Sequence, residues 1–279
     1  MKQSATSRMY TPILAAVFAA LASLGAASAT HAAEYSLVVQ PVQSPETTAA
    51  AFQPLADYLS KATGQKIKLV TALNFLTYWE TMKKGDQYDL ILDAAHFTDY
   101  RIKQLNYVPL VKVASVVSFS LVTRDDRAVL DTKELIGKRL AVLPSPSMGY
   151  VRLNQIFPNP LRQPVIVPVN SAEKAAELVK DGKADAAMIP SPMVGSRPYL
   201  YTVQTTAQVP HMALSASPRV PEAVRKAIQD ALLSAPKTPA GRKLLANLNL
   251  GADFEPATAD AYAGYSRLLT GVYGYHPLR

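Results

Sequence analysis

The chain has 279 residues, with 29 Lys and Arg against 21 Asp and Glu, a formal net charge of +8 at pH 7, and no cysteine. The absence of thiols excludes a disulfide framework, a cysteine nucleophile, Cys-ligated zinc or iron–sulfur sites, and an acylated cysteine anchor. Hydrophobic residues make up 49% of the sequence, which at this length supports one or two domains with sizeable cores.

Residues 1–33 have the pattern of a secretory signal peptide. Lys2 and Arg8 supply a positive start, an apolar stretch runs from residue 12 to residue 24, and small residues follow it. This stretch is shorter than the roughly 20 residues of a membrane span, so a cleaved signal is favoured over an uncleaved anchor. Cleavage fits after any of three alanines: Ala29, Ala32 or Ala33. We expect a monomer that diffuses freely in the periplasm.

The positive charge does not indicate a nucleic-acid partner. Basic residues are scattered singly or in pairs, such as Lys83-Lys84, without an interleaved aromatic motif. A mixed, solvated surface is the better interpretation, and its mild positive field favours a small anionic partner.

Strand and helix patterns alternate in the first part of the remaining chain. A β-branched run ends at Pro41, and apolar residues from Thr48 then recur at helical spacing until Gly64, a C-cap signal. The expected elements are strand 35–40, helix 48–64, strand 67–71, helix 78–84 and strand 88–92. This alternation is typical of an open α/β sheet with right-handed crossovers.

The alternation restarts after a β-rich passage at residues 110–123. The expected elements are a short helix 131–135, strand 139–143, a helix starting at 145–149, strand 165–169, helix 171–181 and strand 184–189. A β-rich stretch at 199–205 leads back, and the final part is helical at 221–233, 239–248 and 258–269.

Two α/β units joined by two β-like crossings predict a two-lobed, hinged α/β protein. We expect lobe 1 to comprise residues 34–115 and 210–279, and lobe 2 residues 116–209, with the crossings near 113–118 and 205–213. Its binding site would lie between the lobes, at the carboxyl ends of strands and the N-termini of helices. A single doubly wound domain is the alternative, but lobes of about 100 residues favour two units.

Five segments carry a resemblance to a known family. They are Gln43-Ser44-Pro45-Glu46, the stretch 52–59 with Gly64, Tyr88-Asp89-Leu90-Ile91, Leu135-Ile136-Gly137-Lys138-Arg139 and Gly182-Lys183-Ala184-Asp185-Ala186-Ala187. In this order they resemble the periplasmic phosphate-, phosphite- and phosphonate-binding components of ABC transporters, over roughly residues 34–233. The resemblance implies a type II periplasmic-binding-protein-like fold, and a receptor that closes on a small oxyanion and delivers it to a membrane permease. It implies no cofactor.

In that family the anion is held by a Ser-Thr-Ser-Gly turn at a helix N-terminus, by first-lobe tyrosines and by polar groups near the hinge. The corresponding turn here is Pro146-Ser147-Met148-Gly149, preceded by Ser145. Met148 has no hydroxyl and Pro146 has no N–H, so Ser145, Ser147 and the later amides must serve the anion. We expect this turn to face the ligand; the alternative is a plain serine N-cap.

Further candidates lie in lobe 1 and after the last strand of lobe 2. Ser44 would sit at the cleft edge, or cap the helix that follows it. Tyr78 lies near the position of a first-lobe tyrosine of the family, or packs as a helix residue. Ser191, between two prolines, offers a hydroxyl to the cleft or is a turn residue.

The stretch 93–100 is expected as a loop that follows the third expected strand and points into the cleft. Asp93, His96 and Tyr100 are expected ligand contacts, and a histidine titrating near neutrality would make affinity depend on pH. Asp93 and His96 as metal ligands are a weaker alternative, because no second His or Cys pair is nearby, and we expect no metal. A capping role for Asp93 and a structural role for His96 stay open. His211 is expected to be structural.

An enzyme is not indicated. The chain contains no Gly-x-Ser-x-Gly elbow, no Walker loop, no Gly-x-Gly-x-x-Gly fingerprint and no His-Glu-x-x-His motif. Two alternatives to a transport receptor remain at this stage. One is a periplasmic sensing module that docks on a receptor kinase or chemoreceptor, and the other is a secreted enzyme.

Overall fold

The structure is a computed structural model that describes residues 33–277. The predicted signal peptide, apart from Ala33, lies outside the described residues. In the described part, no helix is long and apolar enough to cross a membrane.

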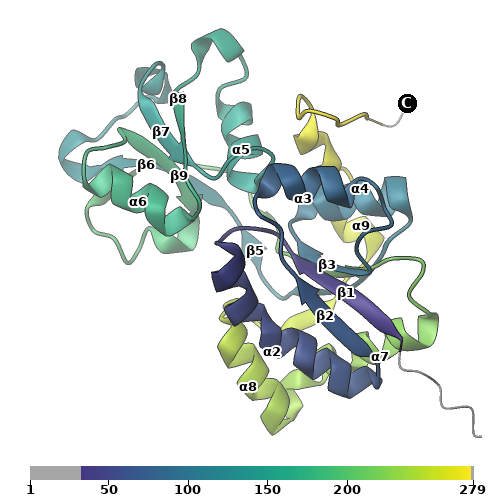
Figure 1. Ribbon diagram of the computed structural model, residues 1–279. Coiled ribbons are helices and arrows are strands. Elements are labelled where there is room, and N and C mark those ends of the chain that lie inside the picture. Colours follow the sequence, from purple (N-terminus) through teal and green to yellow (C-terminus); the bar gives the residue numbers. More distant parts are fainter. Residues whose placement is uncertain (1–32, 278–279) are drawn as a thin grey trace, which may run out of the picture. The chain divides into compact units, whose positions relative to one another are not determined.

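One unit is built on a six-stranded sheet with the order β13-β4-β12-β3-β1-β2. Figure 1 labels β1, β2 and β3 of this sheet. Its first part consists of β1 (Glu34–Val39), α2 (Pro45–Thr63), β2 (Lys66–Val70), α3 (Phe75–Met82), β3 (Leu90–Asp93), α4 (Ala95–Leu105) and β4 (Val108–Val113). Its second part consists of β12 (Ala213–Ala216), α7 (Glu222–Leu233), α8 (Pro239–Leu248), β13 (Phe254–Pro256) and α9 (Ala259–Tyr262). Strand β1 pairs in parallel with β2 and β3, whereas β4, β12 and β13 run antiparallel to their neighbours.

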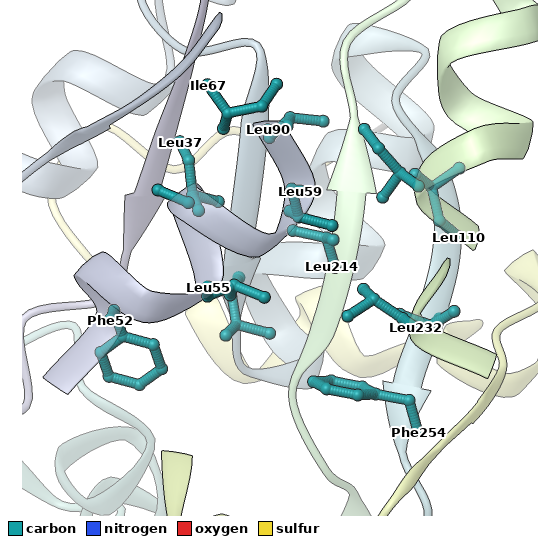
Figure 2. Packing of buried hydrophobic residues seen from close by; sticks show 14 of the residues in the cluster. Leu37, Phe52, Leu55, Leu59, Ile67, Leu90, Leu110, Leu214, Leu232 and Phe254 are labelled. Carbon is teal, nitrogen blue, oxygen red and sulfur yellow. The ribbon is translucent and has the colours of Figure 1, made fainter. Parts of the chain in front are cut away.

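Alternating side chains of the central strands supply both faces of this sheet. Leu37 and Leu90 belong to a core with α2, α7 and α8, in which Leu55 and Leu232 are also buried (Figure 2). Val38 and Ile91, one residue further along each strand, belong to a second core with α3 and α4. Successive side chains of a strand point to opposite faces, so uninterrupted apolar runs such as 37–39 fit a sheet covered by helices on both sides.

The other unit is built on a five-stranded sheet with the order β10-β6-β9-β7-β8. Its elements are β6 (Phe119–Arg124), β7 (Arg139–Val142), α5 (Met148–Ile156), β8 (Val165–Pro168), α6 (Ala172–Lys180), β9 (Ala186–Pro190) and β10 (Leu200–Thr205). Strand β7 pairs in parallel with β8 and β9, while β6 runs antiparallel to β9 and β10. Helix α6 packs on one face through Ala175 and Val179, and α5 on the other through Leu153.

Two short strands carry the chain between the sheets. β5 (Val116–Val117) leads from β4 to β6, β11 (Val209–Pro210) leads from β10 to β12, and the two pair antiparallel. Two α/β units with two crossings are the two-lobed architecture that the sequence predicts.

Three sequence-based expectations differ from the structure. The stretch after β3, expected as a loop, is helix α4, whose N-cap residue Ala94 makes no side-chain hydrogen bond and so left no capping signal. The helix expected at 258–269 is divided into the short α9 and a 3₁₀ turn (Tyr265–Leu269), because Gly264 adopts a left-handed φ of 90°. Two strands, β12 and β13, fall in stretches to which no element was assigned.

Candidate functional site

A cavity of about 570 Å³ lies where the ends of the parallel strands of both sheets converge. Residues at or directly after the ends of β1, β3, β7 and β9 line it, together with the starts of the helices that follow β2 and β8 and the crossing segments 115–117 and 210–212. The carboxyl ends of parallel strands are where open α/β sheets bind ligands, because loops and helix N-termini meet there. The position of the cavity therefore follows from the strand order.

The start of α5 forms one wall of the cavity through Ser147, Met148 and Gly149. Ser147 is the N-cap: its Oγ accepts a hydrogen bond from the Tyr150 N–H at 3.2 Å and donates one to the Leu143 carbonyl at 2.7 Å. The hydroxyl is thus engaged within its own turn. The backbone N–H groups of Met148 and Gly149 have no partner among the described residues, as expected for the first positions of a helix.

The same turn also packs into a core of the six-stranded sheet. Met148 and Val151 are buried in the core formed by α3 and α4, which includes Phe75 and Phe97. Gly149 lies against Phe119 and Met188, where an added Cβ would be 3.5 Å from either side chain. The helix start is therefore packed against both sheets and fixed in direction.

Asp93 is placed in a buried polar cluster, and it does not line the cavity. Its carboxylate forms a bidentate ion pair with Arg101, with 2.7 Å between Asp93 Oδ1 and Arg101 Nη2, and both side chains are fully buried. It also accepts hydrogen bonds from the Tyr78 hydroxyl and from Thr98 Oγ1, the latter at 3.2 Å. Ser215 accepts a further bond from Arg101. These partners occupy the carboxylate that the sequence assigned to a ligand.

Tyr78 is fully buried in this cluster and in the aromatic core beside Phe97, again away from the cavity lining. Burial, and then the neighbouring Asp93 carboxylate, raise the pKa of Tyr78 well above its ordinary value. The phenol therefore stays protonated and donates to Asp93.

His96, on α4, is fully buried and also lies outside the cavity lining. Its Nε2 donates to the Pro146 carbonyl at 2.9 Å, which connects α4 to the loop before α5 and leaves Nδ1 as an acceptor without a partner among the described groups. Burial lowers the pKa of His96 to about 4, against opposing effects of the Pro146 carbonyl and Asp93. The ring is therefore neutral at pH 7.

The other predicted residues lie at separate places. Ser44 is the N-cap of α2 and accepts from the Thr47 N–H at 3.2 Å. Ser191 accepts hydrogen bonds from Ser118 and Ser120, each at 2.9 Å, and Ser145 precedes the α5 turn; neither lines the cavity. Tyr100 lines a different hollow of about 290 Å³, shared with Lys103, Ser266 and Arg267.

Several cavity residues escaped the sequence analysis. Gln40 follows β1; its Oε1 accepts from the Ala94 N–H at 3.2 Å and its Nε2 contacts Met212 Sδ at 3.1 Å. His211, expected to be structural, lines the cavity after β11, and its Nδ1 accepts from the Met212 N–H at 2.8 Å. The rule that ligands bind after parallel strands would have selected Gln40, because it ends the first predicted strand.

Among the residues that the structure describes, no group of three or more His, Asp or Glu side chains is arranged to hold a metal ion. Asp93 and His96, the weaker metal alternative, are engaged with Arg101 and Pro146 respectively.

Solved structures of similar architecture identify the class. PhnD1 from Prochlorococcus marinus, in complex with methylphosphonate, superposes with a TM-score of 0.72 and 13% identity, over 86% of this chain and 98% of its own. A binding protein component of an ABC phosphonate transporter from Pseudomonas aeruginosa gives 0.69 and 14%, over 85% of each chain. XAC2383 from Xanthomonas citri, bound to ATP, gives 0.68 and 16%, over 86% of this chain and 100% of its own. The fold is that of a type II periplasmic binding protein.

The family follows from the sequence as a whole. The family model described as ABC transporter, phosphonate, periplasmic substrate-binding protein matches residues 37–262, and the chain belongs to this family. No curated protein matches the sequence significantly. Members of the family are periplasmic solute-binding proteins that work with an ABC transporter permease, as the resemblance in the sequence implied.

Proposed function

We propose that this chain is the solute-binding component of an ABC transporter and that it takes a small solute with an oxyanion group into the cavity between its lobes. One observation carries the proposal: Met148 and Gly149, whose backbone N–H groups have no partner among the described residues, line a cavity at the converging strand ends. An oxyanion accepts hydrogen bonds from such groups and is attracted by the positive end of the helix dipole.

The proposed cycle is closure by rotation about the two crossings. Lobe 1 comprises residues 34–115 and 210–279 and lobe 2 residues 116–209, so β5 and β11 form the hinge. Ligand contacts made by both lobes favour the closed form, which the permease recognises. We further infer export through a cleavable signal at residues 1–33, a monomeric state, and no catalytic activity.

Ligand-induced closure can be measured directly. We expect small-angle X-ray scattering to show a smaller radius of gyration when the protein is saturated with a compound that binds. A suitable panel contains phosphate, phosphite, methylphosphonate and simple carboxylates, first ranked by thermal shift. A panel in which several compounds bind by calorimetry but none changes the radius of gyration would contradict closure.

The helix start is tested by Ser147→Ala. This substitution removes the N-cap and leaves the Leu143 carbonyl without its hydroxyl donor. Loss of an N-cap costs about 1 kcal/mol, so if binding must reorder the turn, affinity falls about fivefold. Ser145→Ala is the matched control, because Ser145 is neither the cap nor part of the lining. Unchanged affinity for Ser147→Ala by calorimetry would remove the α5 turn from the site.

A further inference from the structure

The lining of the cavity is unusually apolar for a site that binds only an inorganic oxyanion. Hydrophobic side chains reach it from both sheets and from the crossings. They include Phe75, Phe119, Met148, Met193, Met212 and Leu250. Three of these are methionines, whose flexible and polarisable side chains adapt to irregular apolar ligands. A free phosphate or phosphite ion would leave this surface without a partner.

The charges around the cavity are equally informative. Among the described residues, no Lys or Arg lines it, and its one carboxylate, that of Glu173, is solvent-exposed. His211 is mostly buried, and burial, followed by the nearby Lys112, lowers the pKa of its ring, so it carries no charge at neutral pH. A doubly charged ligand would therefore be taken out of water without a cationic side chain to compensate it.

The start of α5 supplies the one positive electrostatic feature of the lining, whose other polar side chains, apart from Glu173, are the uncharged Gln40, Gln43, Ser115, Ser147, His211 and Asn249. The N–H groups of Met148 and Gly149 are free, and the α5 dipole places about half a positive charge beside them. Ser147 and Gln40 add little, because their polar atoms already bond to Leu143, Ala94 and Met212. The two N–H groups and the partial charge at the start of α5 match the two oxygens of one singly charged head group, and the uncharged polar side chains add no positive charge for a second negative charge.

The volume of the cavity also fits a ligand with a polar head group and an apolar body. Cavities of about 300–1,000 Å³ hold organic ligands whose surface is largely buried against apolar side chains, with a few polar groups that set the orientation. At about 570 Å³, this cavity lies within that range.

We propose that the ligand is an amphiphilic organic monoanion, with a carboxylate-like head at the N–H groups of Met148 and Gly149 and a hydrocarbon body along the methionine and phenylalanine side chains. The proposal rests on the receptor function above and narrows its solute class.

The test is calorimetry of the purified protein with two homologous series, unbranched carboxylates from acetate to octanoate and alkylphosphonates of the same lengths. Each added methylene buried against the lining should raise affinity about fourfold until the cavity is full. At equal chain length, and at a pH where the phosphonate carries two charges, the carboxylate should bind more tightly. Inorganic phosphate should bind more weakly than the longer carboxylates.

A variant isolates the apolar wall. Met193 is half-buried and lines the cavity, so Met193→Ala should weaken octanoate binding severalfold and leave acetate binding unchanged. Leu130→Ala, at a position that is 80% exposed and outside the lining, is the control and should change neither. A general loss of stability in Met193→Ala would not reduce the dependence of affinity on the chain length of the carboxylate.

Three results would overturn the inference. They are an affinity that does not rise with chain length, tighter binding of phosphate or methylphosphonate than of every carboxylate, and an unchanged chain-length dependence in Met193→Ala. If phosphonates bind and carboxylates do not, the receptor function stands and only the ligand class is wrong. If neither series nor any compound in a wider solute panel binds, both proposals fail.

Discussion

Replacing Asp93 by asparagine separates a structural role of this residue from a role in ligand binding. Asp93 and Arg101 form a fully buried ion pair, and the carboxylate also accepts from Tyr78 and Thr98. Asparagine keeps the shape of the side chain but removes its charge. Arg101 would then be a buried cation without its counter-ion, and the amide nitrogen of the asparagine would face a donor.

The expected cost follows from this geometry. Removing one partner of a buried ion pair destabilises a protein by about 3–5 kcal/mol, because the remaining charge is left uncompensated. This is a large share of the total stability of a domain, which is about 5–15 kcal/mol. For a protein of this size, a loss of 1 kcal/mol lowers Tm by about 2–4 °C, so a fall of about 6–20 °C is expected.

Urea unfolding followed by circular dichroism measures the loss of stability, and calorimetry well below the midpoint measures ligand affinity. We expect Asp93→Asn to be strongly destabilised and to bind ligand as the wild type does, because Asp93 does not line the cavity. Asp126→Asn is the matched control, since it breaks an Arg–Asp pair whose carboxylate is exposed, and it should unfold close to the wild-type midpoint.

A double variant tests whether the uncompensated charge of Arg101 causes the loss of stability. Replacing the pair by apolar residues, Asp93→Leu with Arg101→Met, removes both buried charges and should recover much of the stability lost in Asp93→Asn. The reasoning would be refuted if Asp93→Asn weakened ligand binding while leaving the urea midpoint unchanged. That result would make Asp93 a ligand contact, as the sequence indicated.

Two further substitutions probe the fold. Burial lowers the pKa of His96 from 6.5 to about 4, so the unfolded chain binds a proton on this residue more tightly than the folded chain does. The free energy of unfolding should therefore fall by about 3 kcal/mol as the pH drops from above 6.5 to 4. His96→Gln lacks this titration, so urea midpoints of variant and wild type that fall in parallel between pH 6.5 and 4 would contradict the assignment. A Cβ at Gly241 would lie 2.2 Å from the Ala235 carbonyl oxygen, so Gly241→Ala should cost about 1–3 kcal/mol or more. Gly195→Ala, with no atom within 4 Å of the added Cβ, should leave the thermal midpoint unchanged, and equal midpoints for the two variants would refute the steric argument.

Local signals predicted most of the elements. Ser44 before Pro45 and Gly64 after the apolar repeat delimit α2, because a serine cap, a first-turn proline and a left-handed glycine act within a few residues of one another. Helix α4 lacked such signals: its N-cap is an alanine, and its buried positions include His96, Asp99 and Arg101 as well as apolar residues. Its polar side chains are buried because they pair with one another or with residues on other elements, and a hydrophobic periodicity does not detect that.

In the candidate site, too, the sequence located the binding region but not the partners of its polar side chains. The sequence placed the binding region after the parallel strands, and the Ser147–Gly149 turn does line the cavity found there. It also assigned Asp93, His96 and Tyr78 to the ligand, whereas the structure gives each of them a buried protein partner. Asp93 ends β3 and pairs with Arg101 on the helix that follows, whereas His96 on that helix pairs with Pro146, which precedes α5 on the other sheet.

The sequence by itself determined the fold class, the family and the start of the helix that faces the cavity, because these depend on residue periodicity and on caps whose partners are near in the chain. Only the tertiary structure decided which polar groups remain free. Hydrogen bonds to other elements occupy Asp93, Ser191 and Gln40, whereas the N–H groups of Met148 and Gly149 have no partner among the described residues. Although the chain is positively charged, no lysine or arginine among its described residues lines the cavity, because these residues lie elsewhere in the fold.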